Sequence, residues 1–294
     1  MLILDYSFAH RLFHPFFDVL VKEMKAGGLM AQKGRWSSAP MMKPDIIWGL
    51  SWNACEHLNS LPKRYFVIQT EPLVVREKYD KRWPKLEFLL KHATFVFDYY
   101  LEGHQPWYDR WDTPAFELPL CYSSHFAKAI RFSYAPRIQQ TCDVLFYGCT
   151  SPRRDALVRS LKKKGLRVIY GVIKGEKRDR LIQGASIVIS SGAKDEHAEG
   201  NVDAFRIMPL LSAGVFVIAE ENPKAMFFKI LKAEGLVCGS YDDLPSLCKT
   251  WIEKGKAARS RVVSSLLTYI SKEFRMDDGF RAWHSLIKEK SLKK

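Results

Sequence analysis

An arginine pair follows a glycine and a hydroxyl-rich loop in residues 143–154, which read DVLFYGCTSPRR. The apolar run before Gly148 is typical of a buried strand, and the segment after the arginines has the pattern of an amphipathic helix. Glycine lets a ligand approach the backbone, and the amides at a helix N-terminus bind anions. Arginines in the first turn oppose the helix dipole unless an anion compensates them. The pattern therefore indicates an anion site that includes Arg153 or Arg154, with an ordinary strand-to-helix turn and solvated arginines as the alternative.

The elements that would position this loop alternate along the whole chain. Apolar runs that predict strands occur at residues 2–5, 45–49, 64–70, 94–99 and 116–120, and again at 144–148, 166–170, 186–190 and 215–220. Helical patterns separate these runs. Alternating strands and helices predict parallel sheets, whose ligands bind beyond the carboxyl ends of the strands.

A break in the pattern predicts two domains. Residues 133–142, SYAPRIQQTC, contain a proline and polar residues and show no periodicity, so we interpret them as a linker. We expect an α/β fold of two tandem doubly wound, Rossmann-like domains over 1–135 and 140–275, followed by a basic helix over 276–294. The cleft between two such domains is the default ligand site.

The composition favours a globular protein with an anionic partner. Hydrophobic residues make up 47% of the 294 residues, and the net charge is +14. Such a charge suits nucleic acid, an acidic membrane surface or phosphorylated small molecules. The basic residues are scattered, however, and none of the basic segments is interleaved with aromatic residues as in single-strand binders. We therefore do not expect nucleic acid to be the partner.

Cysteine usage and hydropathy suggest a cytoplasmic protein. The six cysteines show neither a CxxC pair nor a metal-ligand spacing, so we interpret them as reduced thiols. The sequence has no run approaching 18 apolar residues, so no transmembrane segment is expected. The N-terminus has no basic leader before its apolar residues, so a signal peptide is not expected either.

Several phosphate- and metal-binding motifs are absent from the sequence. They are GxGxxG after a strand, GxxxxGK followed by Ser or Thr, GxSxG, and Asp-x-Asp. Their absence argues against a dinucleotide-binding Rossmann domain, a P-loop, a hydrolase nucleophile elbow and a metal ion held against a diphosphate.

Three segments of the second half carry a family pattern in their order and spacing: DVLFYGCTSPRR, GEKRDRLIQGASIVIS and VDAFRIMPLLSAGVFVIAEE. They resemble the C-terminal domain of GT-B glycosyltransferases, in particular short enzymes of bacteria and large DNA viruses. In the first half, YFVIQTEPL, FVFDYY and LPLCYS resemble further segments of that group, so the resemblance covers about residues 64–222. It implies GT-B architecture, with an acceptor-binding N-terminal domain, a C-terminal domain for the nucleotide sugar, and the inter-domain cleft as the site.

Two features depart from the family pattern. Many retaining GT-B enzymes carry two glutamates eight positions apart at the helix after residue 200, whereas Glu199 would here pair with Ile207. The residue before x-x-Arg is Asp203 where the short enzymes usually have Glu. Pro209 also lies inside the predicted helix, where it removes a backbone hydrogen bond.

The resemblance implies a donor site built from the second half. Arg153 or Arg154, together with Arg206, would bind the diphosphate, Asp203 would hold it or the ribose, and Glu220 would bind ribose hydroxyls. The other expected donor contacts are Gly148, Thr150, Gly171 and Val172. Asp203 and Arg206 lie three residues apart on one helix face, so a surface ion pair is the alternative. For Glu220 the alternative is a solvated loop acid, and Glu221 is its neighbour.

The catalytic base is expected from the first half, where the acceptor would bind. Glu71 follows the strand YFVIQT directly and is the first choice, ahead of Asp98 and Asp5, which also end apolar runs. The expected acceptor contacts are His14 in a nearby loop and Trp52, which could stack on a sugar ring. For each of these residues a purely structural role is the alternative.

The resulting hypothesis is a metal-independent glycosyltransferase. It would move a hexosyl or pentosyl group from a UDP- or GDP-sugar to a hydroxyl of a glycan or glycoprotein, in the cytoplasm, or in the host cytoplasm if the protein is viral. No cofactor is expected, because arginines and helix amides would replace the metal. His10 and His14 have the spacing of metal ligands but no evident third partner. The alternatives are a non-catalytic GT-B-like protein, a nucleic-acid-binding protein that uses its basic surface, and an epimerase on the same architecture.

Overall fold

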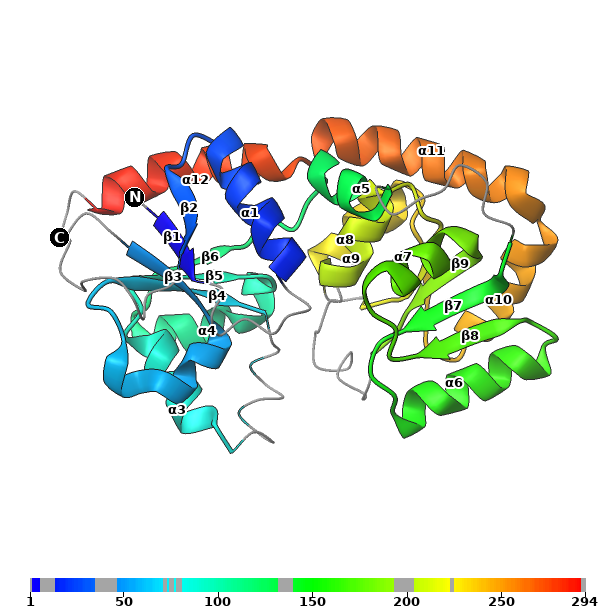
Figure 1. The fold of residues 1–294 in the computed structure, drawn as a ribbon, viewed down its shortest axis with the longest axis horizontal. Coiled ribbons are helices and arrows are strands. Elements are labelled where there is room, and N and C mark those ends of the chain that lie inside the picture. The colour runs from blue at the N-terminus through cyan, green and yellow to red at the C-terminus, as the bar shows by residue number, and fades with distance from the viewer. Residues whose placement is uncertain are drawn as a thin grey trace. The chain divides into compact units, whose positions relative to one another are not determined.

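A computed structural model of the chain describes residues 2–5, 14–34, 47–70, 73, 77, 81–131, 140–192, 204–222 and 225–291 (Figure 1). The chain divides into two compact units. The first consists of Met1–Cys121 with Arg275–Lys294, and the second is Tyr122–Phe274. Each unit has its own parallel sheet.

Six described strands form the first sheet, in the order β2-β1-β3-β4-β5-β6. Their bounds are β1 Leu2–Asp5, β2 Ala31–Gly34, β3 Ile47–Ser51, β4 Tyr65–Gln69, β5 Phe95–Asp98 and β6 Ala115–Glu117. The helices of this unit are α1 His14–Ala26, the 3-10 helix η3 Trp52–Ser60, α3 Trp83–Lys91, α4 Leu101–Trp111 and α12 Met276–Ser291. In Figure 1, α1 and α12 lie on one face of the sheet and α3 and α4 on the other.

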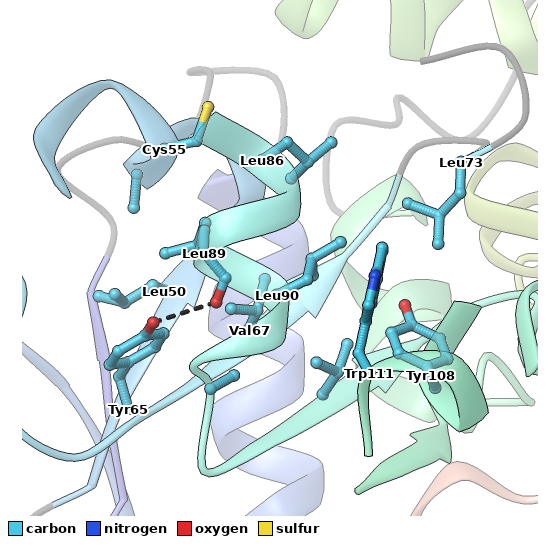
Figure 2. Packing of buried hydrophobic residues seen from close by; sticks show 13 residues of the cluster. Leu50, Cys55, Tyr65, Val67, Leu73, Leu86, Leu89, Leu90, Tyr108 and Trp111 are labelled. Atoms are coloured by element: carbon cyan, nitrogen blue, oxygen red, sulfur yellow. Dashed lines mark hydrogen bonds between the residues drawn. The ribbon is translucent and has the colours of Figure 1, made fainter. Parts of the chain in front are cut away.

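The central strand β4 is buried on both faces, as its continuous apolar run predicts. On one face, Tyr65 and Val67 pack with Leu89 and Leu90 of α3 (Figure 2). The Tyr65 hydroxyl donates to the Leu89 carbonyl oxygen at 3.0 Å, and burial raises the pKa of Tyr65 to about 12. On the other face, the Phe66 ring stacks on Phe95 with centroids 5.0 Å apart.

The C-terminal helix belongs to the first unit. The centre of its Trp283 ring lies 4.1 Å from that of Phe97 in β5. Phe280 packs against Gly27, the residue after α1, because a Cβ added to Gly27 would lie 2.7 Å from the Cβ of Phe280. The sequence predicts a basic helix over 276–294, and the described part of that segment is the helix α12, whose apolar side chains pack on the first sheet. After Phe274 the chain leaves the second unit and returns to the first.

Five described strands form the second sheet, in the order β11-β10-β9-β7-β8. Their bounds are β7 Cys142–Tyr147, β8 Val168–Gly171, β9 Ala185–Ser190, β10 Val217–Glu220 and β11 Val237–Gly239. The helices of this unit are α5 Ser124–Arg131, α6 Pro152–Lys163, α7 Gly175–Gly184, α8 Ala204–Ser212, α9 Met226–Ala233, α10 Leu244–Glu253 and α11 Gly255–Glu273. The α/β fold with two parallel sheets is as the sequence predicts.

One hydrophobic cluster of the second unit lies between its sheet and the helices α6 and α10. Val144 and Phe146 of β7 alternate toward this side and pack with Leu157 and Leu161, which are one turn apart on α6. The helix begins where the sequence predicts it, because Ser151 caps it and Pro152 occupies its first turn. The strand end and the helix start are therefore both fixed, and the loop between them is short.

Within the described part of the chain, every helix is too short or too polar to span a membrane.

Candidate functional site

The second sheet changes its direction of winding between β7 and β9. The chain passes from β7 to β8 on one side and then returns to β9 on the other, which opens a crevice beyond the carboxyl ends of these strands. Gly148 follows β7, Ser191 follows β9, and Glu220 ends β10. The candidate site is this edge of the sheet, together with the first turns of α6 and α8.

Arg153 and Glu220 form a buried ion pair at the edge. Arg153 Nη1 donates to Glu220 Oε2 at 2.8 Å, and Nη2 donates to Oε1 at 2.5 Å. The same carboxylate accepts from the Ser191 hydroxyl at 2.6 Å and from the Gly192 amide at 3.2 Å. The guanidinium carbon lies 3.9 Å from the centre of the Tyr241 ring. The pair therefore connects α6 to the ends of β9 and β10 and stabilises this edge of the sheet.

Arg154 is held by backbone oxygens and is only 5% exposed. Its Nη2 donates to the Ser191 carbonyl oxygen at 2.7 Å, and its Nη1 donates to the Cys149 carbonyl oxygen at 2.9 Å. The guanidinium carbon lies 5.2 Å from the centre of the Phe146 ring. Neither arginine of the pair is a solvated side chain, because Arg154 is buried and Arg153 is only 16% exposed. That the loop binds an anion stays a prediction.

Gly148 lies against two guanidinium groups. Its φ is +138°, a conformation that favours glycine. A Cβ built on it would be 3.1 Å from Arg154 Nη1 and 3.1 Å from Arg206 Nη2, so the two cations approach the same point. The guanidinium of Arg206 also lies 5.3 Å from the centre of the Tyr147 ring. Two cations this close repel each other, and an anion bound over Gly148 would stabilise both.

The turn after β8 borders the same loop. The Gly148 amide donates to the Gly171 carbonyl oxygen at 3.0 Å. Gly171 has a φ of +137° and open space where a Cβ would stand, and the next residue, Val172, is 62% exposed. Thr150 is exposed in the glycine loop itself. Open backbone beside an exposed apolar side chain suits a planar heterocyclic ring.

The structure brings most of the expected donor residues to one edge. They are Gly148, Thr150, Arg153, Arg154, Gly171, Val172, Arg206 and Glu220. Asp203 lies outside the described residues. Ser191 is not among the expected donor residues, although it directly follows a buried strand, as Gly148 does. The ligand contacts of all these residues stay predictions.

The first sheet has its own switch point, between β1 and β3. Asp5 ends β1, Trp52 follows β3 as the first residue of η3, and His14 is the first residue of α1. By topology these three backbone positions belong to the carboxyl edge, where an acceptor is expected. Glu71 comes two residues after β4 but is outside the described residues, as is His10.

Asp98 lies at the end of β5 but is fully buried. Its carboxylate accepts from the Tyr108 hydroxyl in a short hydrogen bond, from His104 Nδ1 at 2.8 Å and from the Tyr100 amide at 2.8 Å. The Leu73 amide donates to His104 Nε2 at 3.1 Å, so Nε2 is the acceptor of the ring and Nδ1 donates to Asp98. Burial, followed by the charge of Asp98, raises the pKa of Tyr108 well above its usual value. Asp98 therefore serves as the centre of a polar network inside the fold.

Possible metal ligands are dispersed. Among the described residues, histidine, cysteine and acidic side chains do not gather in any group of three that could hold a metal ion. The six cysteines are free thiols. Metal independence stays a prediction.

Comparison with known proteins finds similar folds at low sequence identity. No protein-family model and no curated protein matches the sequence. A β-glucosyltransferase, described as a DNA-modifying enzyme with the substrate uridine diphosphoglucose, is 10% identical, with a TM-score of 0.60 over 98% of this chain and 100% of that chain. TarM is 11% identical, with a TM-score of 0.57 over 82% of this chain and 54% of that chain. The N-terminal domain of Candida albicans trehalose-6-phosphate phosphatase is 9% identical, with a TM-score of 0.52 over 85% of this chain and 71% of that chain.

These similarities establish the fold. Two of the similar structures are GT-B glycosyltransferases, and the two parallel Rossmann-like sheets of this chain follow the same architecture. The GT-B resemblance expected from the sequence is therefore confirmed at the level of the fold.

Proposed function

We propose that this chain is a glycosyltransferase that moves a sugar from a nucleoside diphosphate donor to a hydroxyl group of a glycan. The single observation that carries the proposal is the approach of Arg154 and Arg206 to Gly148 at the switch point of the second sheet. A diphosphate bound at this point would accept charged hydrogen bonds from both guanidinium groups. The GT-B fold makes glycosyl transfer the reaction that best uses such a site.

In this proposal each part of the edge has a separate role. The diphosphate lies over Gly148, where the missing side chain leaves room and where Arg154 and Arg206 stabilise the leaving group. The base lies along Gly171 and Val172, and the ribose reaches toward Glu220. Arg153 holds Glu220 in place through the buried ion pair. Because guanidinium groups stabilise the developing charge, the transfer needs no metal ion.

The proposed base is Glu71, with Asp5 as the second candidate. Asp5 ends β1, and Glu71 comes two residues after β4 in the sequence. Asp98 is now the weakest of the three, because a carboxylate that is fully buried and accepts three hydrogen bonds cannot reach an acceptor hydroxyl without unfolding its network. His14 and Trp52 remain the proposed acceptor contacts. Cysteine usage favours a cytoplasmic site of action.

Duplex DNA is the second candidate acceptor. The net charge of +14 suits a polyanion, and one of the similar structures, matched over its whole length, is that of a DNA-modifying enzyme. A purely DNA-binding, non-catalytic protein would share that charge but would not need the arginine arrangement at Gly148.

Thermal unfolding of the full chain in EDTA tests the function. UDP or GDP at about 100 times its Kd should raise the stability by about 2.7 kcal/mol, and the corresponding nucleoside should do far less. Stabilisation by a duplex oligonucleotide as well would favour DNA as the acceptor. Stabilisation by the oligonucleotide alone would instead support the non-catalytic rival, and a strict need for Mn²⁺ would contradict the metal-free site.

A further inference from the structure

The second unit contains a cavity of about 570 Å³ at the edge of its sheet opposite to Gly148. It lies at the amino end of β9, beside the turn between α8 and β10 and under the first turns of α11. Ile182, Phe216 and Val263 supply an apolar lining, while Lys256, Arg259 and Gln183 supply polar groups. Among the described lining residues there are two cations and no carboxylate. This volume is in the range of small-molecule sites.

Arg259 is a buried cation without a carboxylate in ion-pair range among the described residues. It is 9% exposed, and its Nη1 donates to the Trp251 carbonyl oxygen at 2.7 Å. Burial lowers the pKa of Arg259, and the charge of Asp143 acts against that shift. The Asp143 carboxylate, however, binds Arg167, at 3.0 Å from Oδ1 and 3.3 Å from Oδ2. The negative charge near Arg259 is therefore already engaged by another arginine.

Lys256 strengthens the positive potential of the cavity. It lies three residues before Arg259 on α11, so both side chains share one face of the helix. They occupy the N-terminal part of a 19-residue helix that has no acidic residue in its first turn. The dipole of a helix is positive at this end. Two cations there are unfavourable unless an anion accompanies them.

Hydroxyl groups add hydrogen-bonding capacity to the same cavity. Ser260 and Ser264 of α11 line it one turn apart and can bind hydroxyls of a ligand.

We propose that this cavity binds a small phosphorylated, hydroxyl-bearing molecule, with its phosphate on Lys256 and Arg259 and its hydroxyls on Ser260 and Ser264. The apolar lining formed by Ile182, Phe216 and Val263 receives the carbon skeleton. The site is separate from the proposed donor site, because it lies at the opposite ends of the same strands. It does not depend on the proposed glycosyl transfer.

Calorimetric titration of the full chain tests this site, with glucose 6-phosphate, inorganic phosphate and glucose as probes. We expect glucose 6-phosphate to bind and glucose not to bind. Lys256→Ala should weaken the binding of glucose 6-phosphate at least tenfold, because it removes a charged hydrogen bond. Lys256 is an exposed rim residue, so its removal should leave folding intact. Equal binding of inorganic phosphate would identify free phosphate as the ligand of the same site.

Arg206→Ala is the matched control, because it removes a cation at the other edge of the sheet. It should leave the binding of glucose 6-phosphate unchanged, whereas Lys256→Ala should leave the binding of UDP unchanged. Absence of binding by both phosphate probes, or an affinity that Lys256→Ala does not change, would overturn the proposal. Failure of UDP to bind would count against the proposed function alone.

Discussion

Replacing Glu71 with glutamine is expected to lower turnover by about 10²–10⁴-fold and to leave the affinity for the nucleotide sugar nearly unchanged. Glutamine keeps the shape of the side chain but cannot take a proton from the acceptor hydroxyl. Glu71 follows β4 of the first sheet, whereas the proposed donor contacts all come from the second unit. Steady-state kinetics together with calorimetric titration of the donor would separate the two effects.

Two further variants, at Asp98 and Asp5, show which carboxylate is the base. Asp98→Asn should mainly destabilise the fold, by about 1–3 kcal/mol or more, because an amide cannot accept all three hydrogen bonds of the buried network. Its melting temperature should fall while the turnover of the folded protein changes little. Asp5→Asn is the comparison for catalysis. If Glu71→Gln transfers sugar at nearly the wild-type rate and Asp5→Asn is inactive, the base is Asp5.

Removal of the Arg206 guanidinium is expected to weaken UDP or GDP binding by about 10–150-fold and nucleoside binding far less. A hydrogen bond to a charged group contributes about 1.5–3 kcal/mol, and the proposal gives Arg206 such a bond to the diphosphate. Titrations of Arg206→Ala with UDP and with uridine would measure both losses. The comparison between the two ligands isolates the phosphate contribution.

Arg180→Ala is a suitable control for Arg206→Ala. Arg180 lies on α7 in the same unit, its side chain is 69% exposed, and its partner is the exposed Glu176. It carries the same charge but is not near Gly148, so UDP affinity should stay at the wild-type value. An equal loss of UDP and uridine affinity in Arg206→Ala would mean that Arg206 does not contact the phosphates.

Much of the fold could be predicted because buried parallel strands leave a clear pattern. The residues of β4 are all buried, and the sequence correspondingly reads YFVIQ. The edge strands β2 and β11 were missed, since AQKG and VCG are short and carry no apolar run. They exist because β1 and β10 pair with them, Leu2 opposite Ala31 and Ile218 opposite Val237. Such pairing is a tertiary effect that local sequence does not contain.

Site residues that lie at the end of a strand could be predicted from the sequence. Contacts between residues far apart in the sequence could not. Gly148 and Glu220 follow or end apolar runs, so their place at the sheet edge could be expected. The ion pair between Arg153 and Glu220 could not, because 67 residues separate the partners. Likewise, Asp98 has the same sequence context as an active-site acid, and only the packing of His104 and Tyr108 around it reveals a buried network.

A nucleoside diphosphate is proposed to bind at the carboxyl edge of the second sheet. Amide hydrogen exchange of the full chain, with and without saturating UDP, tests this proposal most directly, because protection by a ligand is read segment by segment. We expect slower exchange in residues 148–154 and 171–175, with little change in residues 81–121 of the first unit. UDP binding that leaves 148–154 and 171–175 unprotected, or that protects only the first unit, would contradict it.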